Sequence, residues 1–292
     1  MVVVGSLNTD TTIRVDRLPA PGGTVLGGDP VRSAGGKGGN QAIAAARAGA
    51  RVDMLGAVGK DTDGDASVDA LRAEGVGVDG IARVDRPTGS ATIAVDRRGE
   101  NLIVVAPGAN AALDEGIARR VDGATGVLLA SLEVPMTAVT AAMAAAARHG
   151  WTLVLNPAPA ASLPAELLGL RPILVPNLAE LLALTGADTL EAAIAFLRGK
   201  GISRLAVTLG ADGALVVDGE ARIALPPVAA TVVDATGAGD TFCGVLAAWL
   251  AGGASFLEAA TAANLAAGLS VAHPGARAGS PSASEIGRNL AR

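Results

Sequence analysis

Short apolar runs alternate with alanine-rich helical segments along most of the chain, and this alternation restricts the fold more than any other feature. The runs consist mainly of valine, leucine and isoleucine, which is typical of strands buried on both faces. Strands that alternate with helices predict a parallel sheet covered by helices. The expected strands are residues 2–4, 54–58, 127–130, 153–155, 173–175 and 205–208. The expected helices are residues 40–48, 65–74, 135–149, 178–184, 190–198, 241–251 and 255–272.

Two segments interrupt this alternation. Residues 11–33 are rich in proline, glycine and aspartate, and residues 88–105 alternate in polarity around a tight turn, Arg97-Arg98-Gly99-Glu100. Neither has the pattern of a strand–helix–strand unit, so we expect a small antiparallel sheet that projects from the main domain. Such a sheet could act as a lid over a site, and two ordinary surface hairpins are the alternative.

Charge and composition exclude several classes of protein. The 23 Lys and Arg against 28 Asp and Glu give a net charge of −5, which argues against a protein that coats nucleic acid or an anionic membrane. One cysteine and two histidines exclude a disulfide framework and a Cys/His zinc site. The start lacks the basic region of a signal peptide, and the longest apolar runs have about half of the ~20 residues that a membrane span needs. We therefore expect a cytoplasmic protein.

Polar residues follow five of the expected strands at their carboxyl ends. In an open parallel sheet, ligands bind outside these ends. The pattern therefore predicts a polar crevice along one edge of the sheet. The polar segments are residues 5–10, 131–133, 156–159, 176–180 and 208–210.

The strongest local signal is the stretch from Asp234 to Thr241, which opens an expected helix. Gly237 and Gly239 lie just before that helix, where backbone amides and the helix dipole can hold an anion. Asp240 would lie beside this anion and could accept a proton from an attacking hydroxyl. The simpler alternative is an aspartate that caps the helix after a glycine turn.

A second glycine-rich stretch, residues 35–41, places four glycines around Lys37. Such a stretch allows the backbone to approach a ligand closely, and a flexible loop is the alternative. Asn8 and Asp10 are two residues apart, so in an extended chain they point the same way. They could bind neighbouring hydroxyls of a polyol, or they could be turn residues.

Two further carboxylates are candidates. Asn177 and Glu180 have the spacing of a capping box, which alone would explain them, although they could also bind phosphate-linked magnesium through water. Glu133 follows a buried strand, where a carboxylate is rare without a partner.

In this order, six motifs resemble those of the ribokinase/PfkB-like carbohydrate kinase family, over nearly the whole chain. The motifs are Gly5-Ser6-Leu7-Asn8-Thr9-Asp10, Gly35-Gly36-Lys37-Gly38-Gly39-Asn40-Gln41, Asn156-Pro157-Ala158-Pro159-Ala160, Pro176-Asn177-x-x-Glu180, Thr208-Leu209-Gly210 and Asp234-Ala235-Thr236-Gly237-Ala238-Gly239-Asp240-Thr241-Phe242.

The resemblance implies a single three-layer α/β/α domain over residues 1–292, with a mostly parallel central sheet and a lid formed by residues 11–33 and 88–105. It implies an ATP- and magnesium-dependent sugar kinase, activated by potassium, whose expected reaction converts D-ribose to D-ribose 5-phosphate. It also implies a homodimer paired through the lids.

Alternatives remain within and outside this family. A fructokinase or a nucleoside kinase would share these motifs, and a sugar or nucleotide sensor without activity would not need Asp240 as a base. A nucleoside is disfavoured because the lid segments have no aromatic residue to stack a base. The aromatic residues all lie in expected core elements: Trp151, Phe196, Phe242, Trp249 and Phe256.

The resemblance also assigns roles to individual residues. Asp240 is the expected base, and the expected anion hole is formed by Gly237, Ala238 and Gly239. Besides Asp240, the expected sugar ligands are Asn8, Asp10, Gly36, Lys37, Asn40 and Glu133. The expected nucleotide and magnesium side consists of Asn177, Glu180, Thr208, Gly210, Gly239 and Asn264. The expected potassium loop consists of Asp234, Thr236, Ser270, His273, Gly275, Gly279 and Ser280.

The potassium loop departs from the family pattern. His273-Pro274 stands where members usually have basic residues, and Gly279 stands where they have a serine. Ser280 could supply the missing hydroxyl.

Overall fold

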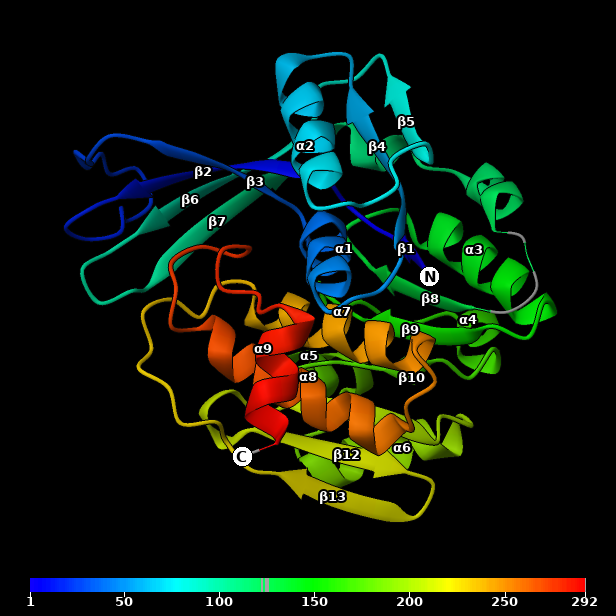
Figure 1. The fold of residues 1–292 in the computed structure, drawn as a ribbon. Coiled ribbons are helices and arrows are strands. Elements are labelled where there is room, and N and C mark those ends of the chain that lie inside the picture. The colour runs from blue at the N-terminus through cyan, green and yellow to red at the C-terminus, as the bar shows by residue number, and fades with distance from the viewer. Residues whose placement is uncertain (122, 124–125, 292) are drawn as a thin grey trace.

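A nine-stranded sheet forms the centre of the computed structural model, which describes residues 1–121, 123 and 126–291 (Figure 1). In spatial order the strands are β13 (Ala221–Leu225), β12 (Ala214–Asp218), β11 (Arg204–Thr208), β10 (Ile173–Leu174), β9 (Thr152–Asn156), β8 (Val127–Ser131), β1 (Val2–Val4), β4 (Asp53–Gly59) and β5 (Ile81–Val84). All neighbours from β11 to β5 are parallel, and β12 and β13 add an antiparallel hairpin at one edge.

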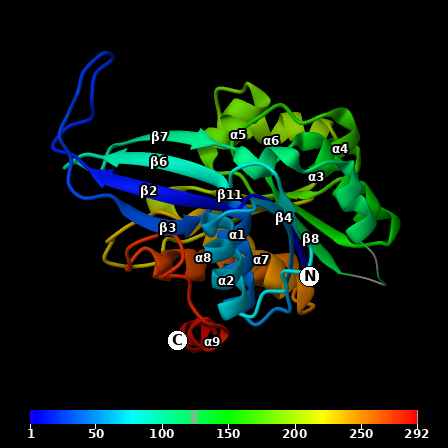
Figure 2. The same ribbon diagram turned by 90° about the horizontal axis from the view of Figure 1, so that it is seen from above.

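Helices cover both faces of this sheet, as Figure 2 shows from above. One face carries α1 (Lys37–Arg47), α2 (Thr62–Ala73), α7 (Ala238–Ala251), α8 (Phe256–Ser270) and α9 (Ala283–Leu290). The other face carries α3 (Met136–Arg148), α4 (Ala165–Gly169), α5 (Leu178–Thr185) and α6 (Leu190–Gly199). The described short 3-10 helices are η1 (Gly108–Ala112), η2 (Glu115–Arg120) and η3 (Gly210–Asp212).

Side chains of the central strands alternate between two apolar cores. Val3 packs with α1, α7 and α8, whereas Val2 and Val4 pack with α3 on the other side. This alternation explains why the strands are apolar throughout, because both of their faces are buried. The expected α/β fold with a mostly parallel sheet is confirmed.

A second, four-stranded sheet projects from one end of the central sheet, to the left in Figures 1 and 2. Its strands, in order, are β3 (Val31–Gly35), β2 (Asn8–Arg14), β6 (Gly89–Val95) and β7 (Asn101–Ala106). We call it the small sheet. The turn between β6 and β7 contains the residues expected there, 97–100.

The small sheet differs from the expected antiparallel sheet in two ways. The outer pairs are antiparallel, but β2 and β6 are parallel. They are parallel because both strands run away from the central sheet, starting from the neighbours Asn8 and Gly89. In addition, β2 and β3 extend to Asn8 and Gly35, beyond the expected limits of 11 and 33, so that they reach the edge of the central sheet.

All expected strands and helices are present, but three helices begin three residues earlier than expected. Helix α1 begins at Lys37, α2 begins at Thr62 and α7 begins at Ala238, so that glycines lie within their first turns. The expectation placed these glycines outside because glycine has a low helix propensity, which packing overrides here. No helix among the described residues is long and apolar enough to cross a membrane.

Candidate active site

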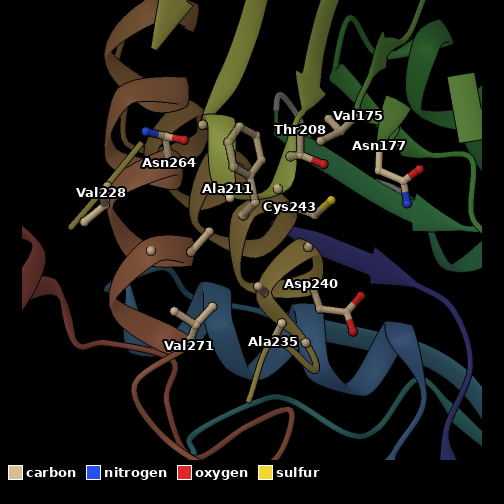
Figure 3. A pocket seen from close by; sticks show the side chains of 18 of the residues that line it. Val175, Asn177, Thr208, Ala211, Val228, Ala235, Asp240, Cys243, Asn264 and Val271 are labelled. Atoms are coloured by element: carbon tan, nitrogen blue, oxygen red, sulfur yellow. The ribbon is translucent and has the colours of Figure 1, made fainter. Parts of the chain in front are cut away.

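A cavity of about 580 Å³ opens at the carboxyl ends of the parallel strands, between α7, α8 and the ends of β9 to β11 (Figure 3). Ligands of open parallel sheets bind outside this edge. All of the expected nucleotide and anion-hole residues line this cavity, together with the expected base: Asn177, Glu180, Thr208, Gly210, Gly237, Ala238, Gly239, Asp240 and Asn264.

Asp240 lies in the first turn of α7, at the floor of the cavity (Figure 3). The N-cap of this helix is Gly237, whose φ of 78° lies in the left-handed region, and a Cβ there would be 2.5 Å from the Ala276 oxygen. Only glycine fits both conditions. The first turn of a helix leaves N–H groups without helical partners, and the dipole favours an anion there. The loop is therefore suited to hold a phosphate beside Asp240.

Two amide side chains from α1 hold the Asp240 carboxylate. Asn40 Nδ2 donates to Asp240 Oδ2 at 2.9 Å, and Gln41 Nε2 donates to Asp240 Oδ1 at 3.0 Å. Burial raises the pKa of Asp240, while the positive charge of Lys37 and the two amides oppose this rise. The arrangement gives a buried carboxylate that has an increased affinity for a proton, as a general base needs.

Asn8, from the start of β2, lies on the side of Asp240 that faces the small sheet. Its Oδ1 accepts a hydrogen bond of 2.7 Å from Asn110 Nδ2. Asn110 is itself fixed by the backbone of Leu7, with a 2.9 Å bond to the Leu7 amide and a 3.2 Å bond to its carbonyl. Because Oδ1 is engaged, Asn8 Nδ2 is the group left to bind a ligand.

Glu133, which follows β8, has two partners near the same place. Its Oε2 accepts from Ser6 Oγ at 2.5 Å and from the Lys37 backbone amide at 3.1 Å. Burial disfavours the charge of the Lys37 side chain, but the carboxylates of Asp240 and Glu133 outweigh burial and raise its pKa. Lys37 therefore remains a cation between two carboxylates.

Asp10 and Arg277 are two further titratable residues of this region, and the charge of each affects the pKa of the other. Burial and then the charge of Glu133 raise the pKa of Asp10 to about 6, although Arg277 opposes the shift. Burial also lowers the pKa of Arg277 to about 10, which leaves it protonated at neutral pH. Arg277 Nε donates to Asn40 Oδ1 and its Nη2 donates to the Gly35 carbonyl, both at 2.8 Å.

On the opposite wall of the cavity, Asn177 and Glu180 form a complete capping box at the start of α5. Asn177 Oδ1 accepts from the Glu180 amide and Glu180 Oε2 accepts from the Asn177 amide, both at 2.8 Å. The interpretation of Asn177 and Glu180 as a capping box is therefore correct for the protein without ligands. Burial raises the pKa of Glu180, and one of its oxygens stays free for a further partner.

The far end of the cavity is mainly apolar. Asn264 is the polar side chain there, and its Nδ2 donates to the Pro226 carbonyl at 2.8 Å (Figure 3). Val228 and Val271 also line this part of the cavity (Figure 3). An apolar slot with one amide is suited to a flat heterocyclic ring.

The structure brings the two halves of the expected potassium loop together. Asp234 Oδ1 accepts from the Thr236 amide at 2.9 Å, and Oδ2 accepts from the Gly275 amide at 2.8 Å. Partial burial favours the neutral acid, but these hydrogen bonds outweigh it and lower the pKa of Asp234. The glycine at position 279, where the family pattern has a serine, has a steric reason in this structure. A Cβ there would be 2.1 Å from the Ser270 carbonyl oxygen.

The other expected loop residues differ in exposure. His273 is exposed, whereas the side chains of Ser270 and Ser280 are buried. The Ser280 hydroxyl has no hydrogen-bond partner within the described part of the chain.

Five polar residues of this region were not among the expected site residues: Ser6, Gln41, Asn110, Asn156 and Arg277. Ser6, Gln41 and Asn156 belong to recognised motifs, so their places in the sequence were usable signals. Arg277 and Asn110 gave no signal in the sequence. Arg277 is 237 residues away from its partner Asn40, and Asn110 is 102 residues away from its partner Asn8. The expectation that Phe196 lies in the core was also wrong. Its side chain is 45% exposed, and Lys200 Nζ lies over its ring, 5.6 Å from the ring centre.

Residues 1–283 match the family described as pfkB family carbohydrate kinase. The chain is 38% identical to the ribokinase of Haemophilus influenzae, over 98% of this chain and 96% of that protein. It is also 37% identical to the bifunctional ribokinase/ribose-5-phosphate isomerase A of Fructilactobacillus sanfranciscensis, over 86% of this chain and 48% of that longer protein.

Solved structures agree with these sequence matches. The ribokinase of Thermotoga maritima superposes with a TM-score of 0.92 at 30% identity, over 100% of this chain and 99% of that one. The ribokinase of Arabidopsis thaliana, complexed with ribose and ATP, superposes with a TM-score of 0.89 at 32% identity, over 99% and 97%.

Proposed function

Because the chain belongs to the pfkB family of carbohydrate kinases, we propose that it transfers the γ-phosphoryl group of ATP to the 5-hydroxyl of D-ribose. The observation that carries this proposal is the position of Asp240. It lies between the cavity and the cluster around Asn8, Asp10 and Asn40, so that one carboxylate borders both candidate ligand sites. The relatives named ribokinase support the choice of sugar.

In the proposed reaction, the sugar hydroxyl attacks the γ-phosphorus of ATP while Asp240 accepts its proton. The P–O bond to ADP breaks as the new P–O bond forms, and the proton remains on the Asp240 carboxyl group. The amides of Gly237, Ala238 and Gly239 and the cation of Lys37 stabilise the charge on the transferred group. Asn8, Asp10 and Asn40 orient the sugar so that its hydroxyl faces Asp240.

Magnesium is the metal that this family implies. Among the described residues, no group of three His, Cys, Asp or Glu side chains is close enough to hold a metal ion. This agrees with magnesium, which usually keeps several waters and is bound through phosphates and one or two carboxylates. Glu180 is the carboxylate that fits this role, through its free oxygen. When bound, the ion would neutralise charge on the β- and γ-phosphates.

The direct test of this function is an assay of ADP release with ribose, deoxyribose, fructose and adenosine as acceptors. We expect the highest kcat/KM with ribose, and phosphorylation at the 5-hydroxyl can be read from the product by NMR. A clear preference for fructose or adenosine would assign another activity within the family, and the absence of ADP release with all four would refute the kinase assignment.

For the domain organisation, we propose one domain in which the small sheet acts as a lid over the sugar. Asn8 and Asp10 begin β2, so the sugar site is continuous with this sheet. Closure of the sheet over the sugar would exclude water, which would otherwise hydrolyse ATP.

A homodimer joined through the small sheets is the corresponding proposal for the assembly. Strand β7 is exposed along its whole length and forms an edge of the small sheet. Its exposed side chains include Leu102, Ile103, Val104 and Val105. A long apolar edge strand favours pairing with another chain.

We therefore expect a dimer by light scattering at micromolar concentration, and a monomer after the double substitution Ile103→Glu and Val104→Glu. The charges would have to be buried against the partner without a counter-ion, which is strongly unfavourable. Phe196→Ser, on an exposed ring outside the small sheet, is the matched control and should leave the dimer intact. A wild-type monomer would reject the pairing, although not the kinase.

Potassium activation is a further proposal for the loop around Asp234. The ionised carboxylate and the buried hydroxyl of Ser280 are chemically suited to a monovalent cation. Asp234 precedes Gly237 by three residues in the chain, and Gly237 lies against Ala276 in the second half of the loop. An ion there would not touch substrate. It would keep the amides of the anion loop in position, which lowers the barrier of the chemical step more than it improves binding.

Turnover should accordingly be at least about threefold faster in potassium than in sodium at equal ionic strength, with a smaller change in the KM for ATP. Asp234→Ala should abolish the difference between the two salts, whereas Asp188→Ala, an exposed aspartate before α6, should preserve it. Equal rates in both salts would show that the loop is ordered without the ion.

A further inference from the structure

Arg277 connects the loop after α8 to the centre of the active site. Its Nε and Nη2 donate to Asn40 Oδ1 and to the Gly35 carbonyl, as described above. The guanidinium lies against Gly39, where a Cβ would be 2.6 Å from Nη2. The absence of a side chain at position 39 therefore leaves the space that Arg277 occupies.

This contact determines the direction of the Asn40 amide. An arginine side chain has donors and no acceptor, so its Nε can bond only to the oxygen of that amide. Asn40 Nδ2 must then point the other way, and it donates to Asp240 Oδ2 at 2.9 Å.

The opposite end of the network is fixed in the same manner. Asn156 Nδ2 donates to the Val175 carbonyl at 2.8 Å, and a carbonyl can only accept. Asn156 Oδ1 therefore faces Gln41, whose Nε2 donates to it at 3.1 Å and to Asp240 Oδ1 at 3.0 Å. Rotation of the Gln41 amide would place its oxygen against two other oxygens, so the observed orientation is retained.

Gln41 Oε1 shows that this orientation has a cost. That atom is buried and has no hydrogen-bond partner among the residues that the structure describes. An unpaired buried acceptor is unfavourable. The network keeps it nevertheless, and both oxygens of Asp240 receive a donor in return. Hydrogen bonds from N–H donors are stronger to a charged carboxylate than to a neutral acid, so the network favours the carboxylate, which is the form that a base needs. Each oxygen keeps a second lone pair, which can accept the proton of the substrate.

We propose that Arg277 is a positioning residue that fixes the side-chain amide of Asn40, so that Asn40 presents its Nδ2 and not its Oδ1 to Asp240. This proposal rests on the proposed role of Asp240 as the base. Without Arg277, the Asn40 amide could turn by half a rotation and offer Oδ1 to Asp240. Asp240 would then have to be protonated to pair with it.

The other groups around Asp240 do not replace this effect. The charged or titratable side chains that act on Asp240 are Lys37, Arg277, Asp10, Glu133, Glu180 and Cys243. Three of them are carboxylates and favour protonation of Asp240, and Cys243 is a buried neutral thiol whose pKa is raised by burial. Lys37 is the only one besides Arg277 that favours the ionised form.

The test is the pH dependence of kcat/KM for ribose, measured in an Asp10→Asn background because Arg277 also acts on the pKa of Asp10, which is about 6. In that background the acidic limb reports the pKa of the base in the free enzyme. In Arg277→Met, we expect the acidic limb to move to higher pH by about one unit, because both the donor and the charge that favour the carboxylate are lost. At a pH well above the limb, where Asp240 is ionised in any case, kcat should fall by less than about threefold. Arg277→Lys keeps a cation with donors only and should shift the limb less.

Two further variants separate positioning from other effects. Gly39→Ala should reproduce the shift, because its Cβ displaces the guanidinium while the charge remains in the protein. Arg47→Met is the matched control. Arg47 Nη1 donates to the carbonyls of Arg277 and Ser280 and so anchors the same loop, but it does not contact Asn40. This variant should leave the limb of the Asp10→Asn background unchanged.

An unchanged limb in Arg277→Met and Gly39→Ala would overturn the proposal, and so would an equal shift in Arg47→Met, which would assign the effect to loop anchoring. If circular dichroism showed that Arg277→Met does not fold, the acidic limb of Gly39→Ala would be the deciding measurement. A wild-type chain without kinase activity would instead refute the proposed function, so the two failures can be distinguished.

Discussion

Replacement of Asp240 by asparagine should lower kcat by roughly 10²–10⁴-fold, because the side chain keeps its shape but can no longer accept a proton. Sugar affinity should change little, since hydrogen bonding to a hydroxyl remains possible. The measurement is steady-state turnover together with calorimetric titration of ribose. Near-normal turnover would reject Asp240 as the base.

The same substitution should also affect stability in a characteristic way. Asp240 accepts from both Asn40 and Gln41, so an amide nitrogen at this position must face one of these donors. One buried donor is then unpaired, which costs about 1–3 kcal/mol. Glu258→Gln is the control, since Glu258 also lies in the first turn of a helix, α8, but outside the cavity. It should leave kcat unchanged.

The order of the elements could be predicted from the sequence because the central strands are buried on both faces. Their apolar runs are continuous and contrast with the polar residues that follow each strand, so both the sheet and its ligand-binding edge were recognisable. The hairpin of β12 and β13 was missed, although Gly219 and Glu220 form its two-residue turn, with glycine at the first position. Strand β13 is mostly exposed and has a mixed pattern, unlike the continuous apolar runs of the buried strands.

The pairing within the small sheet could not be predicted from local pattern. Alternation in residues 88–105 shows that strands form, but it does not show which partner each strand takes. The parallel pairing of β2 with β6 joins residues about 80 positions apart. Pairings between such distant segments depend on the tertiary structure and leave no local signal.

Motifs identified the carboxylate and the anion loop, but not the groups that orient them. Asp240 lies in a glycine-rich stretch whose spacing indicates its chemistry. Arg277 lies in an irregular loop, and nothing around it in the sequence indicates that it contacts Asn40. A residue that acts through a neighbour can be recognised only when both are seen in place.

The sugar side of the site gives the second prediction with a large effect. Asn8→Ala, Asp10→Ala and Asn40→Ala should each weaken ribose binding by about 1–3 kcal/mol, because a buried sugar hydroxyl loses its partner. This corresponds to roughly 5–150-fold in Kd. ATP affinity should remain close to that of the wild type, since none of the three lines the cavity.

A reciprocal control makes this prediction specific. Asn264→Ala, at the far end of the cavity, should weaken ATP binding and leave ribose binding unchanged. Calorimetry with each ligand alone measures both affinities without turnover. An effect of a substitution on the chemical step therefore does not enter the measured affinities. Asn110→Ala should weaken ribose binding less than Asn8→Ala, because it only releases the Asn8 amide from its 2.7 Å hydrogen bond and does not remove it. If all three variants bound ribose normally, the sugar would have to bind away from the Asp240 cluster, and the proposed transfer geometry would be wrong.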